Sequence, residues 1–341
     1  MYMKAKFGLG IATGTEGLMY PIPYSSLDDV IELSILAEKL GFDSVWGNDH
    51  LTTQSYVWDE FQKQPRYYAP LLTLSAIARE TTTLNVATAL LVIPFRHPLI
   101  VAKELVTLDL ISKGRLYIGV GLGAYREEFE AQFGDKSKKM HRGKMLDESL
   151  EVIKRLFNER SVNFEGKYFQ LKDAVCYPKP ETIQFPFYIG GNSANSYERV
   201  EKYGTGWLPA LLTPEEVSNG RRALEVVFSE SDRSIDEIDI APQLSVSIAK
   251  THEEAVEKYE RSQMYKHSVS LQQSTMKGKD TSNYLERNLI GSVEEVEEMV
   301  ERYIEAGVTT FSALIFTDNT VEETKEHIQL FSETIIKKYA E

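Results

Sequence analysis

The feature that most constrains the fold is a regular alternation of short apolar segments with longer segments of helical periodicity, along almost the whole chain. The short segments are nearly all apolar, which is typical of strands buried on both faces of a parallel sheet. The longer segments repeat apolar residues at helical spacing. The alternation therefore predicts an α/β protein with a parallel sheet.

Eight strand–helix units can be counted. The predicted strands cover residues 5–11, 42–46, 83–93, 115–123, 185–191, 206–211, 238–249 and 308–316. Eight units in one chain favour a (β/α)8 TIM barrel with insertions over an open, doubly wound sheet. Two Rossmann-like halves are the alternative, but no Pro-, Gly- and Ser-rich linker separates them. We therefore expect a single domain over residues 1–341.

Two segments interrupt this alternation. Residues 161–173 alternate between polar and apolar and turn at Gly166, which predicts a small inserted hairpin. Residues 266–291 are polar and only weakly periodic. A connection of this length is usually either functional or disordered, so the segment is interpreted as a mobile lid or a simple surface excursion.

Charge and cysteine content exclude several classes of protein. The net charge of −13 argues against binding to nucleic acid or to an anionic membrane, because both need clustered Lys and Arg. Cys176 is the only cysteine, so there is no intramolecular disulfide and no Cys-based metal site. With no signal peptide and no membrane-spanning segment in the sequence, we expect a cytoplasmic protein.

Polar residues follow the second predicted strand. Asn48, Asp49 and His50 come directly after an apolar run. Catalytic residues of a TIM barrel lie where the strands end, so Asp49 and His50 are candidate catalytic residues. His50 could act as a general base, contact a cofactor, or simply bond a loop carbonyl.

Glycines end two further predicted strands. The segment "GVGLGA" (119–124) lacks the spacing and position of a dinucleotide fingerprint, so we interpret Gly121 and Gly123 as room for a flat ring near the backbone. In "YIGGNSANSYERV", Gly190 and Gly191 precede residues that can begin a helix. The free backbone N–H groups of a helix start suit a phosphate, although an ordinary turn has the same pattern.

Metal and hydrolase chemistry are disfavoured. The chain has no G-x-S-x-G nucleophile motif. Its remaining histidines show neither H-x-H nor H-E-x-x-H spacing, so no metal site is predicted. These histidines are His97, His141, His252, His267 and His327.

Several segments, taken in order, resemble the bacterial luciferase-like flavin-dependent monooxygenase superfamily. They are "AEKLGFDSVWGNDHL", "IPFRHPLIVAKELVTLDLISKGRLYIGVGLG" followed by "EEFEAQFG", "HRGKMLDESLEVIKRLF", "PFYIGGNSANSYERVEKYGTGW" and "GSVEEVEEMVERYIEAGVTTF". The resemblance implies a luciferase-like TIM barrel that binds reduced FMN, supplied by a separate flavin reductase, and uses O2 to oxygenate a small-molecule substrate. It also implies a homodimer.

The resemblance assigns residues of this chain. His50 matches the functional histidine of the family, and Asp49 matches a polar neighbour of the cofactor. Ala89–Leu90 matches a non-prolyl cis peptide beneath the flavin ring, and Arg142 lies near a phosphate-binding arginine. Trp46 and Trp207 are expected to shape the pocket. The predicted cofactor-binding residues are Ala89, Leu90, Gly121, Arg142, Gly190, Gly191, Asn192, Ser193 and Asn195.

Two departures from the family pattern leave the reaction open. Leu122 stands where luciferase has a phosphate-binding arginine, and Ala124 stands where a deazaflavin-dependent sugar dehydrogenase subgroup has an acidic proton donor. A deazaflavin coenzyme with hydride transfer is the alternative to FMN. A flavin-binding protein without turnover is the third reading. No residue identifies the substrate.

Overall fold

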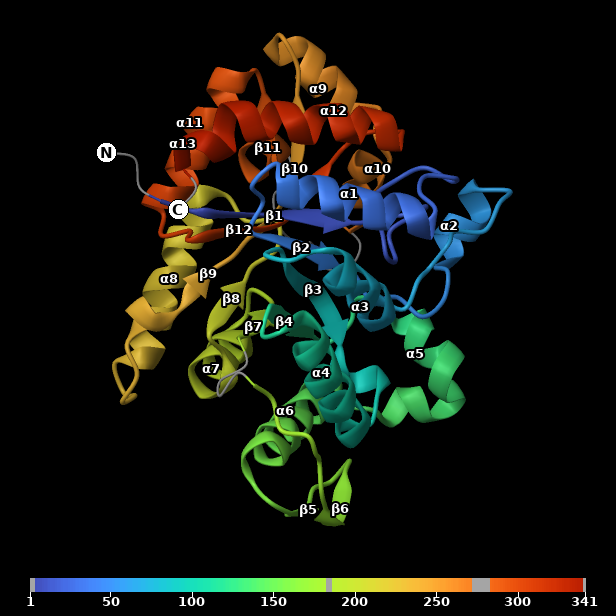
Figure 1. Cartoon of the computed structure of the whole chain (residues 1–341), viewed down its shortest axis with the longest axis vertical. Coiled ribbons are helices and arrows are strands. Elements are labelled where there is room, and N and C mark those ends of the chain that lie inside the picture. The colour runs from blue at the N-terminus through green and yellow to red at the C-terminus, as the bar shows by residue number, and fades with distance from the viewer. Residues whose placement is uncertain (1–3, 182–185, 272–282, 340–341) are drawn as a thin grey trace.

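A curled parallel sheet forms the centre of the protein, and helices cover its outside (Figure 1). The computed structural model describes residues 4–181, 186–271 and 283–339. Its ten-stranded sheet has the order β11-β10-β12-β1-β2-β3-β4-β7-β8-β9, and all its pairings are parallel. The predicted α/β fold with a parallel, barrel-like sheet is confirmed.

The predicted strands are present, and one of them is interrupted. The seventh divides at Pro242, which has no N–H to donate to a neighbouring strand. An additional strand, β11 (Leu289–Gly291), pairs with β10 and was not predicted. The remaining strands are β1 (Lys6–Ile11), β2 (Ser44–Gly47), β3 (Asn85–Val92), β4 (Leu116–Gly121), β7 (Phe187–Gly190), β8 (Gly206–Leu208), β9 (Asp239–Ile240), β10 (Gln243–Ile248) and β12 (Thr310–Phe316).

The interior of the curled sheet has a core of its own. A bridge from Ala210 to Gln243 and a hydrogen bond from Thr309 N to Ile240 O join the β8–β9 edge to β10 and β12. Side chains from strands on all sides therefore meet inside the sheet. The buried members of this cluster are Trp46, Ala87, Ala89, Tyr188, Leu208, Ala241 and Ala313.

Helices pack on the outer face of the sheet over a larger apolar core. The first of these helices follows Ser26, which caps it because its hydroxyl accepts from Asp29 N. No helix in the described ranges is long and apolar enough to cross a membrane. The outer helices are α1 (Leu27–Lys39), α3 (Pro70–Glu80), α4 (Pro98–Ser112), α6 (Arg142–Asn158), α7 (Ala194–Tyr203), α8 (Pro214–Phe228), α9 (His252–Glu260), α11 (Val293–Glu305), α12 (Val321–Phe331) and α13 (Lys337–Tyr339).

The connections between these units carry the remaining elements. An antiparallel hairpin of β5 (Val162–Glu165) and β6 (Gln170–Ala174) occupies the position of the predicted insertion, at the lower end of Figure 1. Three short helices were not predicted: α2 (Ser55–Glu60), α5 (Arg126–Phe133) and α10 (Gln263–Leu271). The segment 266–291 thus begins inside α10, and its central residues 272–282 lie outside the described part of the chain.

Candidate active site

A hollow of about 370 Å³ opens at the C-terminal ends of the strands. Its size is within the range of small-molecule and cofactor sites, and its lining is mostly apolar. Residues from β3, β7, β8, β10, β12 and α10 contribute to it. Of the predicted site residues, those that line it are Asp49, His50, Ala89, Leu90, Gly190, Gly191 and Ser193.

The residues that follow β2 hold the floor of this hollow in place. Asn48 donates from Nδ2 to the carbonyl oxygen of Ala89 at 2.9 Å. The peptide bond from Ala89 to Leu90 is cis, at the position that the family resemblance predicts. The side chain of Asn48 therefore holds the Ala89–Leu90 peptide group in place, and with it the backbone of Leu90.

Asp49 is tied to the bend after β3. Its Oδ2 accepts from Val92 N at 2.9 Å and from Arg96 Nη1 at 2.6 Å, and its Oδ1 accepts from Arg96 Nη2 at 2.9 Å. The carboxylate is buried, and the bidentate ion pair with Arg96 satisfies both of its oxygens. Asp49 therefore has the environment of a residue that positions the site, although it borders the hollow.

His50 forms a pair with a carboxylate from α5. Its Nδ1 lies 3.1 Å from Glu128 Oε2, and Glu128 Oε1 accepts from Leu51 N at 2.8 Å. Gln54 Nε2 is also near Nδ1, at 3.3 Å. Glu128 is the closer partner and, as a carboxylate, can only accept, so we place the imidazole hydrogen on Nδ1. Nε2 makes no hydrogen bond to a described residue and is available to a ligand.

Three side chains from three elements meet at the mouth of the hollow. The Tyr56 hydroxyl lies 3.0 Å from His267 Nδ1 and 3.2 Å from the Tyr125 hydroxyl. Burial lowers the pKa of His267 to about 3, and the nearby His50 adds to this effect, so His267 is neutral. Burial also raises the pKa of Tyr125 far above its usual value. His267 and Tyr125 are therefore uncharged at physiological pH.

Two glycines accommodate Leu90 rather than a ligand. A Cβ at Gly190 would lie 2.7 Å from Leu90 Cδ1, and a Cβ at Gly121 would collide with the same methyl group. The side chain of Leu90 thus packs closely against both Gly121 of β4 and Gly190 of β7. Gly121 was expected to make room for a flat ring, but the space it leaves is filled by Leu90.

The loop between β7 and α7 offers backbone groups rather than side chains. Asn192 exchanges two hydrogen bonds with the backbone of Ala210, and Asn195 is exposed. The Ser193 hydroxyl contacts Ser196 Oγ at 3.1 Å and does not cap the helix. Within the described residues, the backbone N–H groups of Asn192 and Ser193 make no hydrogen bond, so they are the donors left for an anion.

Arg142 and the two tryptophans support the site from outside the hollow. Arg142 donates to Gly123 O at 2.6 Å and lies over the Phe129 ring, 5.0 Å from its centroid. Burial lowers the pKa of its guanidinium. Trp207 donates from Nε1 to Gly191 O at 2.8 Å, and Trp46 packs inside the sheet. Arg142 and Trp207 thus each bind a glycine carbonyl beside the hollow, and none of the three side chains lines it.

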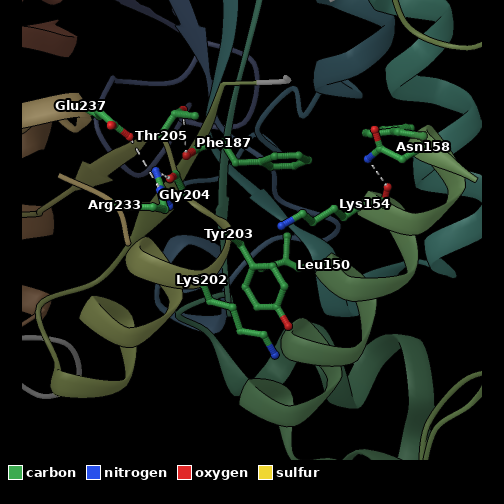
Figure 2. A pocket seen from close by; sticks show the side chains of 11 residues that line it. Leu150, Lys154, Asn158, Phe187, Lys202, Tyr203, Gly204, Thr205, Arg233 and Glu237 are labelled. Carbon is green, nitrogen blue, oxygen red and sulfur yellow. Dashed lines mark hydrogen bonds and ion pairs between the residues drawn. The ribbon is translucent and has the colours of Figure 1, made fainter. Parts of the chain in front are cut away.

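A second hollow of about 340 Å³ lies at the opposite ends of β7 and β8 (Figure 2). Phe187, Tyr203 and Lys154 face it, as Figure 2 shows. Arg233 is held there by the carbonyl groups of Val200 and Gly204. In barrels of this type the N-terminal ends of the strands contribute to stability, so the candidate active site is the first hollow.

Sequence reasoning missed Glu128, Tyr56, Tyr125 and His267. Tyr125 and Glu128 are three residues apart in "YREEFE", which on a helix places them on one side, but nothing in that pattern indicates His50 as their neighbour. In the described ranges, no group of three or more His, Cys, Asp or Glu side chains could hold a metal ion.

Comparison with known proteins adds a family and several relatives. The sequence model of the family described as "Luciferase-like monooxygenase" matches residues 5–310. The F420-dependent glucose-6-phosphate dehydrogenase of Amycolatopsis mediterranei (strain U-32) is 26% identical over 325 residues, which cover 91% of this chain and 94% of that protein.

Two solved structures superpose on almost the whole chain. Monooxygenase RslO1 from Streptomyces bottropensis has a TM-score of 0.79 at 22% identity, and covers 98% of this chain and 100% of its own. An F420-dependent secondary alcohol dehydrogenase, in complex with an F420-acetone adduct, has a TM-score of 0.79 at 23% identity, with 98% of both chains covered. At these identities the likeness concerns the fold, and the two proteins catalyse different reactions.

Proposed function

The chain belongs to the luciferase-like monooxygenase family and is an oxidoreductase of that type, and we propose that it is the oxygenase component of a two-component system. It would use O2 and reduced FMN, delivered by a separate flavin reductase, to oxygenate a small uncharged molecule. The observation that carries this proposal is the apolar hollow at the strand ends, with His50 held at its rim by Glu128.

The residues around the hollow fit a flavin. Leu90, fixed between Gly121 and Gly190, gives the hollow an apolar floor against which a flat ring can pack. The free N–H groups of Asn192 and Ser193 stand at the start of α7, where the helix dipole favours a phosphate. Because Leu122 replaces an arginine at the mouth, we expect the backbone to provide most of the phosphate contacts.

The residues of this chain would orient the reactants and move a proton. A bound reduced flavin supplies two electrons and the position at which O2 reacts. Glu128 accepts from Nδ1 of His50 and so keeps Nε2 directed to the ligand. Nε2 can then take a proton from a bound molecule or return one to it. The apolar lining keeps water away from the reacting groups.

The lining also bears on the charge of the substrate. In the described part of the chain, no Lys or Arg lines the hollow. The carboxylate of Asp49 forms an ion pair with Arg96, so its charge is balanced within the protein. His267 is neutral. A phosphorylated or carboxylated substrate would thus find no partner of opposite charge, and an uncharged molecule fits better.

The test is to follow reduced FMN during its reaction with O2. We expect the full-length protein to bind reduced FMN and to slow the appearance of oxidised FMN, measured by stopped-flow absorbance. An equal amount of bovine serum albumin is the control for non-specific protection. The proposal fails if oxidised FMN appears at the same rate with and without the protein.

A second candidate is hydride transfer to a deazaflavin. It is favoured by the name of the Amycolatopsis relative, whose match covers 91% of this chain. Ala124, which borders the hollow, replaces the acidic proton donor expected in the sugar dehydrogenase branch. The lining without Lys or Arg is likewise unsuited to a sugar phosphate, so an uncharged alcohol would be the substrate of this alternative.

Thermal stability separates the cofactors. A ligand that binds only the folded state raises Tm, and at a given concentration a tighter ligand raises it more. Melting in the presence of FMN or of coenzyme F420 shows which one binds. Stabilisation by F420 alone would replace the first proposal by the second. Stabilisation by FMN without turnover on a substrate panel would favour a flavin-binding protein.

A further inference from the structure

The hydrogen-bonded cluster of Tyr56, Tyr125 and His267 is the feature of the hollow that the proposed function leaves unused. Tyr125 directly precedes α5, Tyr56 belongs to α2, and His267 belongs to α10. Tyr125 and His267 both line the hollow. Three segments far apart in the sequence therefore bring two hydroxyl groups and an imidazole to its mouth.

The hydrogen bonds of this cluster can run in either direction. With its hydrogen on Nδ1, His267 donates to the Tyr56 oxygen, and Tyr56 donates to the Tyr125 oxygen. The hydroxyl hydrogen of Tyr125 is then free to point elsewhere. With the hydrogen on Nε2, Tyr125 donates to Tyr56, and Tyr56 donates to Nδ1. In the first arrangement the cluster itself leaves the hydroxyl hydrogen of Tyr125 for a ligand.

Tyr125, His267 and His50 bring polar groups to a lining that also contains Ser193, Ser196, Gln243 and Ser245. The centroids of the Tyr125 and His50 rings are 5.7 Å apart. Met19, Met264 and Ile315 provide apolar walls elsewhere. Because the hydroxyl of Tyr125 stays protonated in its buried setting, it can serve as a neutral donor. A ligand that places an oxygen atom beside Tyr125 would meet this donor.

We propose that Tyr125 is a substrate-binding residue that donates a hydrogen bond to an uncharged carbonyl or hydroxyl oxygen. His267 is a positioning residue that acts through Tyr56 and through its own 3.5 Å contact with the Tyr125 hydroxyl. The assignment rests on the proposed function, because it concerns the substrate of the same site. It adds the class of substrate and the group that recognises it.

The experiment uses three matched probes with the full-length protein. These are 4-(dimethylamino)benzaldehyde, the corresponding benzyl alcohol, and N,N-dimethyl-4-toluidine, which has no oxygen. The absorption band of the aldehyde moves to longer wavelength when its carbonyl accepts a hydrogen bond. We expect this shift with the wild-type protein, and about fivefold tighter binding of the aldehyde or the alcohol than of the toluidine.

Variants assign the hydrogen bond. Tyr125→Phe should abolish the shift and weaken the oxygen-bearing probes about fivefold, with the toluidine unchanged. Tyr177→Phe, at an exposed tyrosine, is the matched control. His267→Leu should reduce the shift, and His267→Gln, which can still donate to Tyr56, should restore it. If His267→Leu does not fold, Tyr125→Phe alone still tests whether Tyr125 donates the hydrogen bond.

The readout is independent of cofactor and turnover. An absent shift with the wild-type protein, or an equal shift in Tyr125→Phe, overturns the assignment. Tighter binding of the alcohol than of the aldehyde would identify the oxygen as a hydroxyl. FMN binding is measured on the same samples by thermal melting, so the proposed function can fail while the assignment stands, and the reverse.

Discussion

Nδ1 of His50 lies 3.1 Å from Oε2 of Glu128, although 78 residues separate them in the chain. The first residue follows β2, and the second lies in α5. The buried carboxylate also accepts from the backbone N–H of Leu51, so the helix is tied to the loop that carries the imidazole. The geometry of the candidate active site thus depends on how α5 docks against the end of β2.

Glu128→Gln should impair proton transfer without loss of the fold. The amide oxygen can still accept from Nδ1, but it carries no charge, so it stabilises the protonated imidazole less. We expect the effect of the protein on reduced-FMN reoxidation to fall about tenfold or more, measured by stopped flow. FMN affinity should stay within about twofold, because Glu128 contacts protein groups.

Glu130→Gln, two residues further along α5, is the matched control. Glu130 is paired with Arg126 on the surface, where such a pair contributes little. Equal losses in the two variants would contradict the role assigned to Glu128.

Asp49→Asn should act on stability. The substitution leaves Arg96 with a neutral partner at a largely buried site. Because Arg96 is partly exposed, we expect a loss of about 2–3 kcal/mol, less than the ~3–5 kcal/mol of a fully buried pair. Urea unfolding measures this loss. Asp135→Asn, in an exposed pair with Lys138, should change the free energy of unfolding by less than about 0.5 kcal/mol.

Gly121→Ala should weaken cofactor binding by displacing Leu90. The added Cβ would occupy the position of Leu90 Cδ1. We expect FMN affinity to fall about tenfold, since core overpacking of this kind typically costs about 1–3 kcal/mol. The double variant with Leu90→Val lacks that methyl group and should recover part of the affinity. No recovery would mean that Gly121 acts in another way.

Acid should destabilise the protein through His267. In the folded state its pKa is about 3, against an ordinary value of 6.5, so the unfolded chain binds a proton more readily. Its contribution to stability is complete above pH 6.5 and is lost as the pH falls towards 3, by about 1.4 kcal/mol per pH unit. Between pH 7 and pH 5, His267→Leu should therefore lose about 2 kcal/mol less than the wild type in urea unfolding.

The predicted homodimer can be examined through α3 and α4. These helices pack together, and they expose Leu72 and Ile100, with 74% and 55% of their surfaces accessible. Large apolar side chains exposed on neighbouring helices are a feature of protein interfaces. Light scattering after size exclusion should give a dimer mass for the wild type. Leu72→Lys with Ile100→Lys should give monomers, whereas Val226→Lys on α8 should not.

The strands could be predicted because a short apolar run between turn residues is typical of a buried strand. The same logic placed His50 at a strand end. Glu128 could not be predicted, because its contact with His50 depends on the path of the chain between β4 and α6. His267 was hidden for another reason. Its segment is polar and weakly periodic, and its contacts with Tyr56 and Tyr125 join segments far apart in the sequence.

Motif reasoning was weaker where a residue can serve two purposes. Asn192 follows two glycines, as a phosphate ligand would, but its amide is used by the backbone of Ala210. At Gly121, the absence of a side chain leaves space that Leu90 fills. Both partners come from other strands, and no local pattern identifies them. The cis peptide at Ala89–Leu90 was located only because the family resemblance marked it.

The three residues after β2 each contact a different neighbour. Asn48 binds the carbonyl of Ala89, Asp49 binds Arg96, and His50 binds Glu128. For enzyme engineering, this segment should therefore be kept unchanged in any library, since one altered residue would disturb a separate wall of the site. Diversity is better introduced at Met19, Leu211, Met264 and Ile315, whose side chains border the hollow without a polar partner to lose.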